Sequence, residues 1–155
     1  MAEQTQDDRA HNDQAVSDAA LIDRHLSFGW WSLWAFLTLG IVLEAMHAFK
    51  IGWYLSVGNE TRRLMWTLAH SHGALIALVH FAFAQTVHLR KTLHVRPRRM
   101  ASYCLMGASV LLPGSFFLAG TFIYDGDPGV GVFLVPVGAG LLFIAVLLSA
   151  RHVRG

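Results

Sequence analysis

The chain has 155 residues, of which 54% are hydrophobic and only 14% are charged, and its formal net charge is +2. This composition excludes a disordered chain and an ordinary water-soluble domain, and it favours a membrane protein. The small charge gives no reason to expect nucleic-acid binding, and the single cysteine, Cys104, excludes a disulfide framework.

The first segment, residues 1–24, is polar and carries charges of both signs. A secretory signal would begin with basic residues and continue with an apolar core, and this segment has neither feature. We therefore expect residues 1–24 to form a mobile tail or a short surface helix. The transmembrane domain is predicted to occupy residues 25–152.

Four long apolar segments follow in the chain, at about 28–55, 65–87, 101–124 and 131–150. A helix needs about 20 mostly apolar residues to cross about 30 Å of hydrocarbon. Helices also satisfy their own backbone hydrogen bonds, which lipid cannot do. The sequence therefore predicts an all-α protein, an integral membrane four-helix bundle.

The distribution of basic residues predicts the orientation of this bundle. Residues 88–99, between the second and third spans, include five basic residues and no acidic one, and the tail at 151–155 is also basic. By the positive-inside rule both termini are cytoplasmic, as in a multi-pass protein of the bacterial inner membrane, with the lipid bilayer as its surroundings. Arg62 and Arg63 fall on the opposite side and are the one dissonant signal.

Ionisable residues inside the predicted spans are the candidate functional residues, because such groups are costly in hydrocarbon. Glu44 and His47 are three residues apart and share a helix face. His70 and His72 lie at a similar depth on the neighbouring helix, about 200° apart around its axis, so we expect at most one of them to face His47. The residues predicted to surround this site are Lys50, Tyr54 and His80.

Three interpretations of this cluster remain open. In the first, His72, His70 or His47 supplies axial ligands to a b-type haem. In the second, Glu44 and the three histidines hold non-haem iron or copper, or relay protons. A di-iron centre would need its Glu-x-x-His motif twice, and this sequence has it once. In the third, the same groups form a structural network without a cofactor, in an accessory subunit of a membrane complex.

Two stretches carry a resemblance to a known family. Residues 23–31 read DRHLSFGWW, and residues 68–75 read LAHSHGAL. Together they resemble the first two helices of the catalytic subunit of haem-copper oxidases and nitric oxide reductases, in which a His-Gly pair carries an axial ligand of the low-spin haem. The matching pair here is His72-Gly73.

The resemblance implies one bis-imidazole haem rather than a whole catalytic centre. That family's subunit has many more helices, and nothing after His94 corresponds to its copper ligands. The second imidazole would then come from His47, His70 or another subunit. We expect a haem-binding or electron-transfer protein, with no catalytic residues and no enzyme activity of its own, in a homo-oligomer or a larger respiratory-type membrane complex.

Overall fold

The structure is a computed structural model that describes residues 2–90 and 95–153 of the chain. Residues 91–94 of the predicted basic loop and the last two residues of the tail lie outside the described residues. The described part contains the following elements: α1 (Ala2–Ala48), α2 (Gly52–Leu55), η1 (Val57–Asn59), α3 (Glu60–Leu89), α4 (Val95–Thr121), η2 (Val130–Leu134) and α5 (Val135–Val153).

Four of these helical segments are long and apolar enough to cross a membrane: Ala15–Ala48, Glu60–Leu89, Arg96–Thr121 and Val130–Arg151. The shortest has 22 residues and a mean hydropathy of 2.6. At about 1.5 Å per residue, that length matches the hydrocarbon thickness of a bilayer. The predicted all-α bundle of four membrane-length helices is thus confirmed.

The first helix differs from its predicted limits at both ends. It begins at Ala2, so residues 2–24 are continuous with the first span in one helix. It ends at Ala48, and Lys50 then takes a positive φ of 51° that no helix interior allows. The segment at 52–55, expected inside the first span, is the separate short helix α2. The predicted separation of a tail from a domain at residue 24 stays a prediction.

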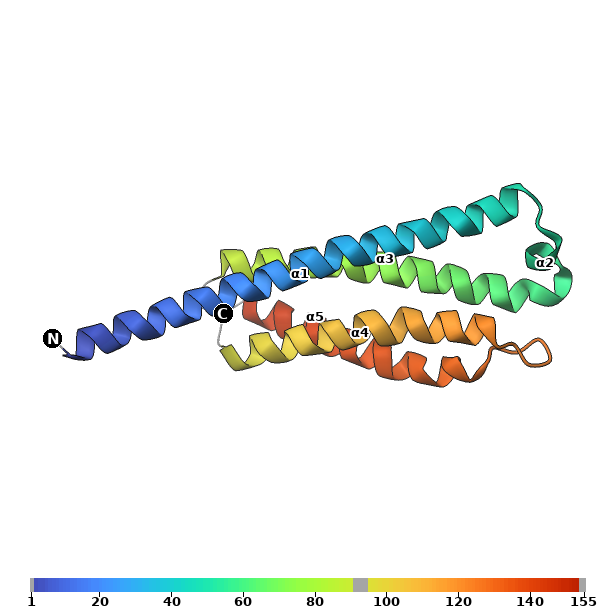
Figure 1. Cartoon of the computed structure of the whole chain (residues 1–155). Helices are drawn as coiled ribbons and strands as arrows, with labels where there is room; N and C mark the ends of the chain where they lie inside the picture. Colours follow the sequence, from blue (N-terminus) through green and yellow to red (C-terminus); the bar gives the residue numbers. More distant parts are fainter. Residues whose placement is uncertain (1, 91–94, 154–155) are drawn as a thin grey trace.

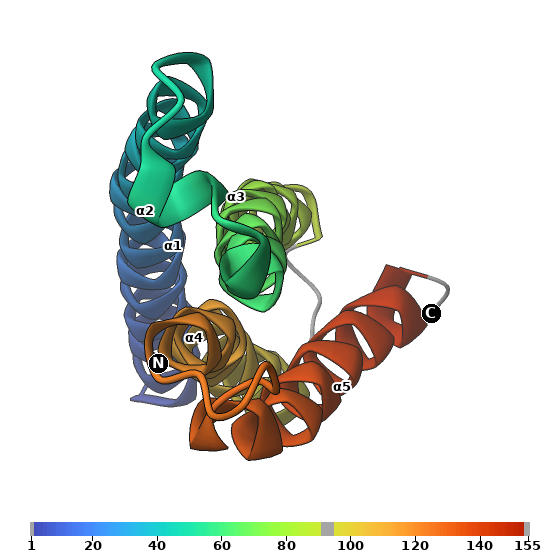
Figure 2. The same ribbon diagram turned by 90° about the vertical axis from the view of Figure 1, so that its right-hand side faces the viewer.

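The helices pack in a chain of neighbours: α1 against α3, α3 against α4, and α4 against α5 (Figure 1). Seen from the end, α1 and α5 lie on opposite sides, with α3 and α4 between them (Figure 2). The end of the molecule that carries Arg90, Arg96 and Arg98 is called the basic end below. The far end carries α2, η1 and the turn between α4 and η2.

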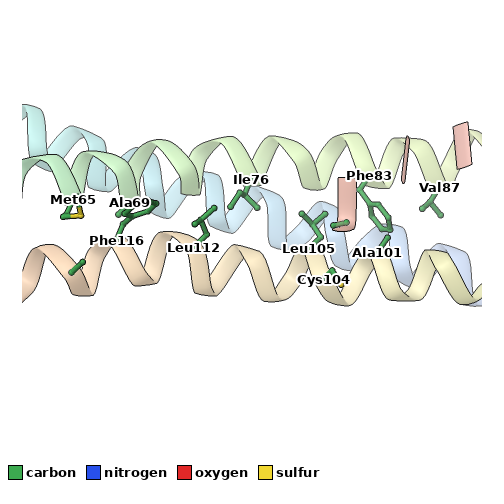
Figure 3. Close-up of a cluster of buried hydrophobic side chains, with 12 residues drawn as sticks. Met65, Ala69, Ile76, Phe83, Val87, Ala101, Cys104, Leu105, Leu112 and Phe116 are labelled. Atoms are coloured by element: carbon green, nitrogen blue, oxygen red, sulfur yellow. The ribbon is translucent and has the colours of Figure 1, made fainter. Parts of the chain in front are cut away.

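The buried core lies mainly between α3 and α4 (Figure 3). Ile76 and Leu105 are almost fully enclosed there, and Ala69 and Ala119 allow the two backbones to approach. In a membrane, where lipid is as apolar as these side chains, close packing rather than escape from water would hold such helices together. The pair α3 and α4 therefore forms the packed centre of the bundle, and several of the polar side chains described below lie on these two helices.

Reciprocal contacts between glycines and rings set the register of α1 against α3. Gly29 receives the ring of Phe81, and a Cβ added there would lie 2.9 Å from it. Farther along, the ring of Phe36 lies over Gly73, and the imidazole of His70 lies over Gly40. Because rings enter gaps on both helices, the two helices have one well-defined register.

Arg62 and Arg63, which depart from the positive-inside pattern, form contacts that join the elements at the far end of the bundle. The Arg62 guanidinium lies 4.6 Å from the Trp53 ring centroid, and its Nε donates a 3.1 Å hydrogen bond to the carbonyl of Gly120. Arg63 donates to the carbonyls of Tyr54 and Ser56 at 3.0 and 3.2 Å. These hydrogen bonds satisfy backbone carbonyls at the ends of α2 and α4, which have no partner within their own helix. Both arginines therefore have a structural role at the end of the molecule opposite the basic end.

Candidate functional site

A buried polar network joins α1, α3 and α4 within the basic half of the bundle. The Nδ1 atoms of His25 and His80 are 2.7 Å apart. His25 Nε2 lies 2.7 Å from the hydroxyl of Ser102, and His80 Nε2 lies 2.7 Å from that of Ser109. Both imidazoles are 0% exposed. Four polar side chains are therefore linked in a row with all ring nitrogens paired.

The direction of every hydrogen bond in this row follows from its last member. Ser109 donates its only hydroxyl proton to the carbonyl of Leu105, so it must accept from His80 Nε2. A neutral His80 then has a bare Nδ1, which accepts from His25 Nδ1–H. His25 Nε2 is bare in turn and accepts from Ser102. The two neutral histidines thus carry their protons on different nitrogens, and no donor is left over.

The sequence-based reasoning missed His25, Ser102 and Ser109, and placed His80 only at the margin of another site. One available signal was the spacing of Ser102 and Ser109, which are seven residues apart and share a face of an otherwise apolar helix. His25 was hidden because it precedes the apolar run taken as the first span. Its partner could not be inferred without the register of α1 against α3.

A second polar region lies toward the far end, in a pocket of about 650 Å³ between α1, α2 and α3. Its polar or ionisable lining residues are Glu44, His47, Tyr54, Thr67 and His70. The other walls are apolar and come mostly from α1. Pockets for cofactors commonly occupy about 300–1,000 Å³ and combine apolar walls with a few polar groups.

His70 is the best positioned side chain in this pocket. Its Nδ1 lies 2.7 Å from the backbone carbonyl of Phe36, so Nδ1 carries the proton and donates it. Because Gly40 has no side chain, the imidazole can rest directly on α1. Among the residues that the structure describes, Nε2 of His70 has no hydrogen-bond partner. This nitrogen is therefore available to a ligand.

His72 takes a different direction, as the helical geometry requires. Its Nδ1 donates to the carbonyl of Leu68 at 2.8 Å, and its ring packs 4.9 Å from that of Phe116 on α4. It does not line the pocket that contains Glu44, His47 and His70. The two neighbouring histidines of α3 therefore serve different surfaces of the helix.

The remaining predicted groups surround the pocket unequally. Glu44 and His47 line it, although both side chains are exposed in the isolated chain. Tyr54 is buried in its wall, and burial raises the pKa of its phenol, against the opposing effect of the Arg63 charge. Lys50 is exposed and does not line the pocket, and His80 belongs to the separate network with His25.

Among the residues that the structure describes, no three histidine, cysteine, aspartate or glutamate side chains gather closely enough to hold one metal ion. Comparisons of the chain with protein-family models, with curated proteins and with solved structures found no match. The protein is thus a four-helix protein with membrane-length apolar helices and a buried histidine network.

Proposed function

We propose that this chain is a small membrane haem-binding subunit of the b type that transfers electrons, with His70 as the residue that would hold the haem iron. One observation carries the proposal. The imidazole of His70 lies on the wall of a pocket of cofactor size, with Nδ1–H donated to the Phe36 carbonyl and Nε2 uncommitted. Histidines that bind metals almost always donate their other ring N–H to a carbonyl, a carboxylate or water.

The ligand count favours haem over a non-haem metal. A non-haem iron site needs about three protein ligands, and no such group gathers in the described part of the chain. Haem needs only one or two, because its porphyrin supplies the other donors. His47 lines the same pocket and offers a second imidazole. His72 faces elsewhere, so it would serve only through a second copy or another subunit of a respiratory-type complex.

The chain itself would hold and tune such a group. When bound, haem supplies a reversible one-electron couple at its iron. Leu37, Ile41 and Leu43 line the pocket and would give the porphyrin an apolar surface to pack against. The Glu44 carboxylate adds negative charge to the pocket wall, which favours the more positively charged state of a redox centre. We place this pocket in the outer half of a bacterial inner membrane, with the basic end cytoplasmic.

The test is an absorption spectrum of the full chain, purified in detergent after expression with added haem precursor. We expect a Soret band and a sharp α band that appears with dithionite, both lost in His70→Ala. The matched control, His88→Ala, removes an exposed histidine of the same helix and should leave the spectrum unchanged. A wild-type protein without a Soret band would overturn the proposal.

The same preparation separates the alternatives. Loss of the spectrum in His72→Ala, with His70→Ala unaffected, would assign the ligand to the His-Gly pair of the family resemblance and refute our choice of His70. Bound iron or copper without a Soret band, released in Glu44→Gln, would indicate the non-haem site. Neither cofactor in a chain that co-purifies with other subunits would indicate a structural accessory role.

A further inference from the structure

A third polar region, independent of the pocket at His70, lies at the basic end. A cavity of about 340 Å³ opens there between α1 and α4. Its polar walls come from both helices: Ser17, Arg24, Arg98, Arg99, Ser102 and Tyr103. Three arginines thus line a space large enough for a small anionic group, with Arg98 buried and Arg24 and Arg99 exposed.

The local carboxylate does not neutralise this cluster. Asp18 pairs with Arg98 at 2.5 Å. Among the described side chains, Arg24 and Arg99 are exposed and have no ion pair, so two positive charges beside the cavity have no carboxylate partner. Like charges brought together repel one another unless an anion joins them. The positive charges beside the cavity therefore favour a ligand with one or two negative charges.

The buried guanidinium of Arg98 supplies a second, independent sign of a ligand. Its side chain is only 2% exposed. Asp18 Oδ1 forms an ion pair with one Nη atom, while Nε and the other Nη of Arg98, and also Asp18 Oδ1, have no hydrogen-bond partner in the described structure. Buried donors are nearly always paired in folded proteins, because an unpaired one costs about 1–3 kcal/mol or more. Arg98 lines this cavity as well as a smaller, mostly apolar space beside Phe83 and Val87, and an acceptor bound in the cavity would offer partners to the guanidinium nitrogens that lack them.

We propose that this cavity binds a phosphate group, carried by the headgroup of an anionic phospholipid. The planar fork of arginine matches the paired oxygens of a phosphate, and the neighbouring Ser17 and Tyr103 hydroxyls add donors. Ser102 contributes no donor, because its proton is used toward His25. The cavity lies at an end of membrane-length helices, where headgroups are found, and basic clusters in this place attract anionic lipid.

The test uses the full chain in an uncharged detergent, titrated separately with phosphatidylglycerol, phosphatidylcholine and inorganic phosphate. Native mass spectrometry counts the bound molecules, and the unfolding temperature reports their effect. The cavity variant is Arg24→Gln combined with Arg99→Gln. Its matched control, Arg90→Gln with Arg96→Gln, removes the same charge from exposed arginines near the same end that do not line the cavity.

We expect the wild type and the control to retain one phosphatidylglycerol, and the cavity variant to bind it on the order of tenfold more weakly. Arg98→Lys keeps a charge for Asp18 but loses the forked donors, so it should weaken binding without unfolding the chain. Saturable binding of inorganic phosphate that competes with the lipid would support the same site with a soluble source. Equal losses in cavity and control variants, or no retained lipid or phosphate, would overturn the proposal.

Discussion

The contact between His25 and His80 leads to a quantitative prediction about stability. Replacing His80 by leucine leaves the Nδ1–H donor of His25 buried without an acceptor. An orphaned buried donor costs about 1–3 kcal/mol, although polar contacts inside membrane proteins average nearer 0.6 kcal/mol. We therefore expect His80→Leu to lower the free energy of unfolding by about 1–3 kcal/mol. His25→Leu should cost about as much, since it strands His80 Nδ1.

The double variant distinguishes this network from simple loss of packing. With both imidazoles replaced, no ring nitrogen remains that could lack a hydrogen-bond partner. Ser102 can then donate to a backbone carbonyl of its own helix. The combined loss should then be smaller than the sum of the single losses by about 1 kcal/mol. The measurement is reversible unfolding in mixed micelles with increasing dodecyl sulfate, followed by circular dichroism.

The control cycle pairs His80→Leu with His88→Leu, an exposed position on the same helix. These two changes share no partner, so their losses should add within about 0.5 kcal/mol. If the losses at His25 and His80 also add within that margin, the hydrogen bond between them contributes nothing measurable. The directional row of bonds inferred above would then be refuted.

Three further outcomes are expected. Nitrogen-15 NMR of histidine-labelled protein should find His25 protonated at Nδ1 and His80 at Nε2; two identical tautomers would contradict the anchoring role of the serine hydroxyl. Gly73→Ala should lower the free energy of unfolding by about 1–3 kcal/mol through overlap with an aromatic ring, while Gly140→Ala, which points into open space, should leave it unchanged or raise it slightly. The raised pKa of Tyr54 means that the unfolded chain loses this proton first, so stability should fall as the pH rises past about 10, and Tyr54→Phe should remove that fall in thermal unfolding.

The membrane-length helices were predictable because their signal is local. Each span needs only a run of apolar residues, and the four predicted segments correspond to α1, α3, α4 and the η2–α5 segment. Helix ends were less predictable, because the end of α1 depends on the backbone turn at Lys50 rather than on hydropathy. The helical state of residues 2–24 was also open from composition alone.

The polar sites were predictable only where they depend on a single helix. The divergence of His70 and His72 follows from two-residue spacing, and the shared pocket of Glu44 and His47 follows from three-residue spacing. The contact of His25 with His80 spans 55 residues of sequence. It requires the relative height of two helices, which no local pattern encodes.

The glycine–ring contacts between α1 and α3 limit which mutations of this sequence preserve the fold, because they tolerate insertions less well than substitutions. A residue inserted into α1 between Gly29 and Gly40 would turn everything beyond it by about 100° and advance it by about 1.5 Å. The apolar character of the helix would be unchanged, yet the glycines beyond the insertion would no longer lie under the rings that contact them. Point substitutions on the exposed side of α1 would disturb this fit less, whereas a change of length in this segment would misalign the two histidine sites relative to each other.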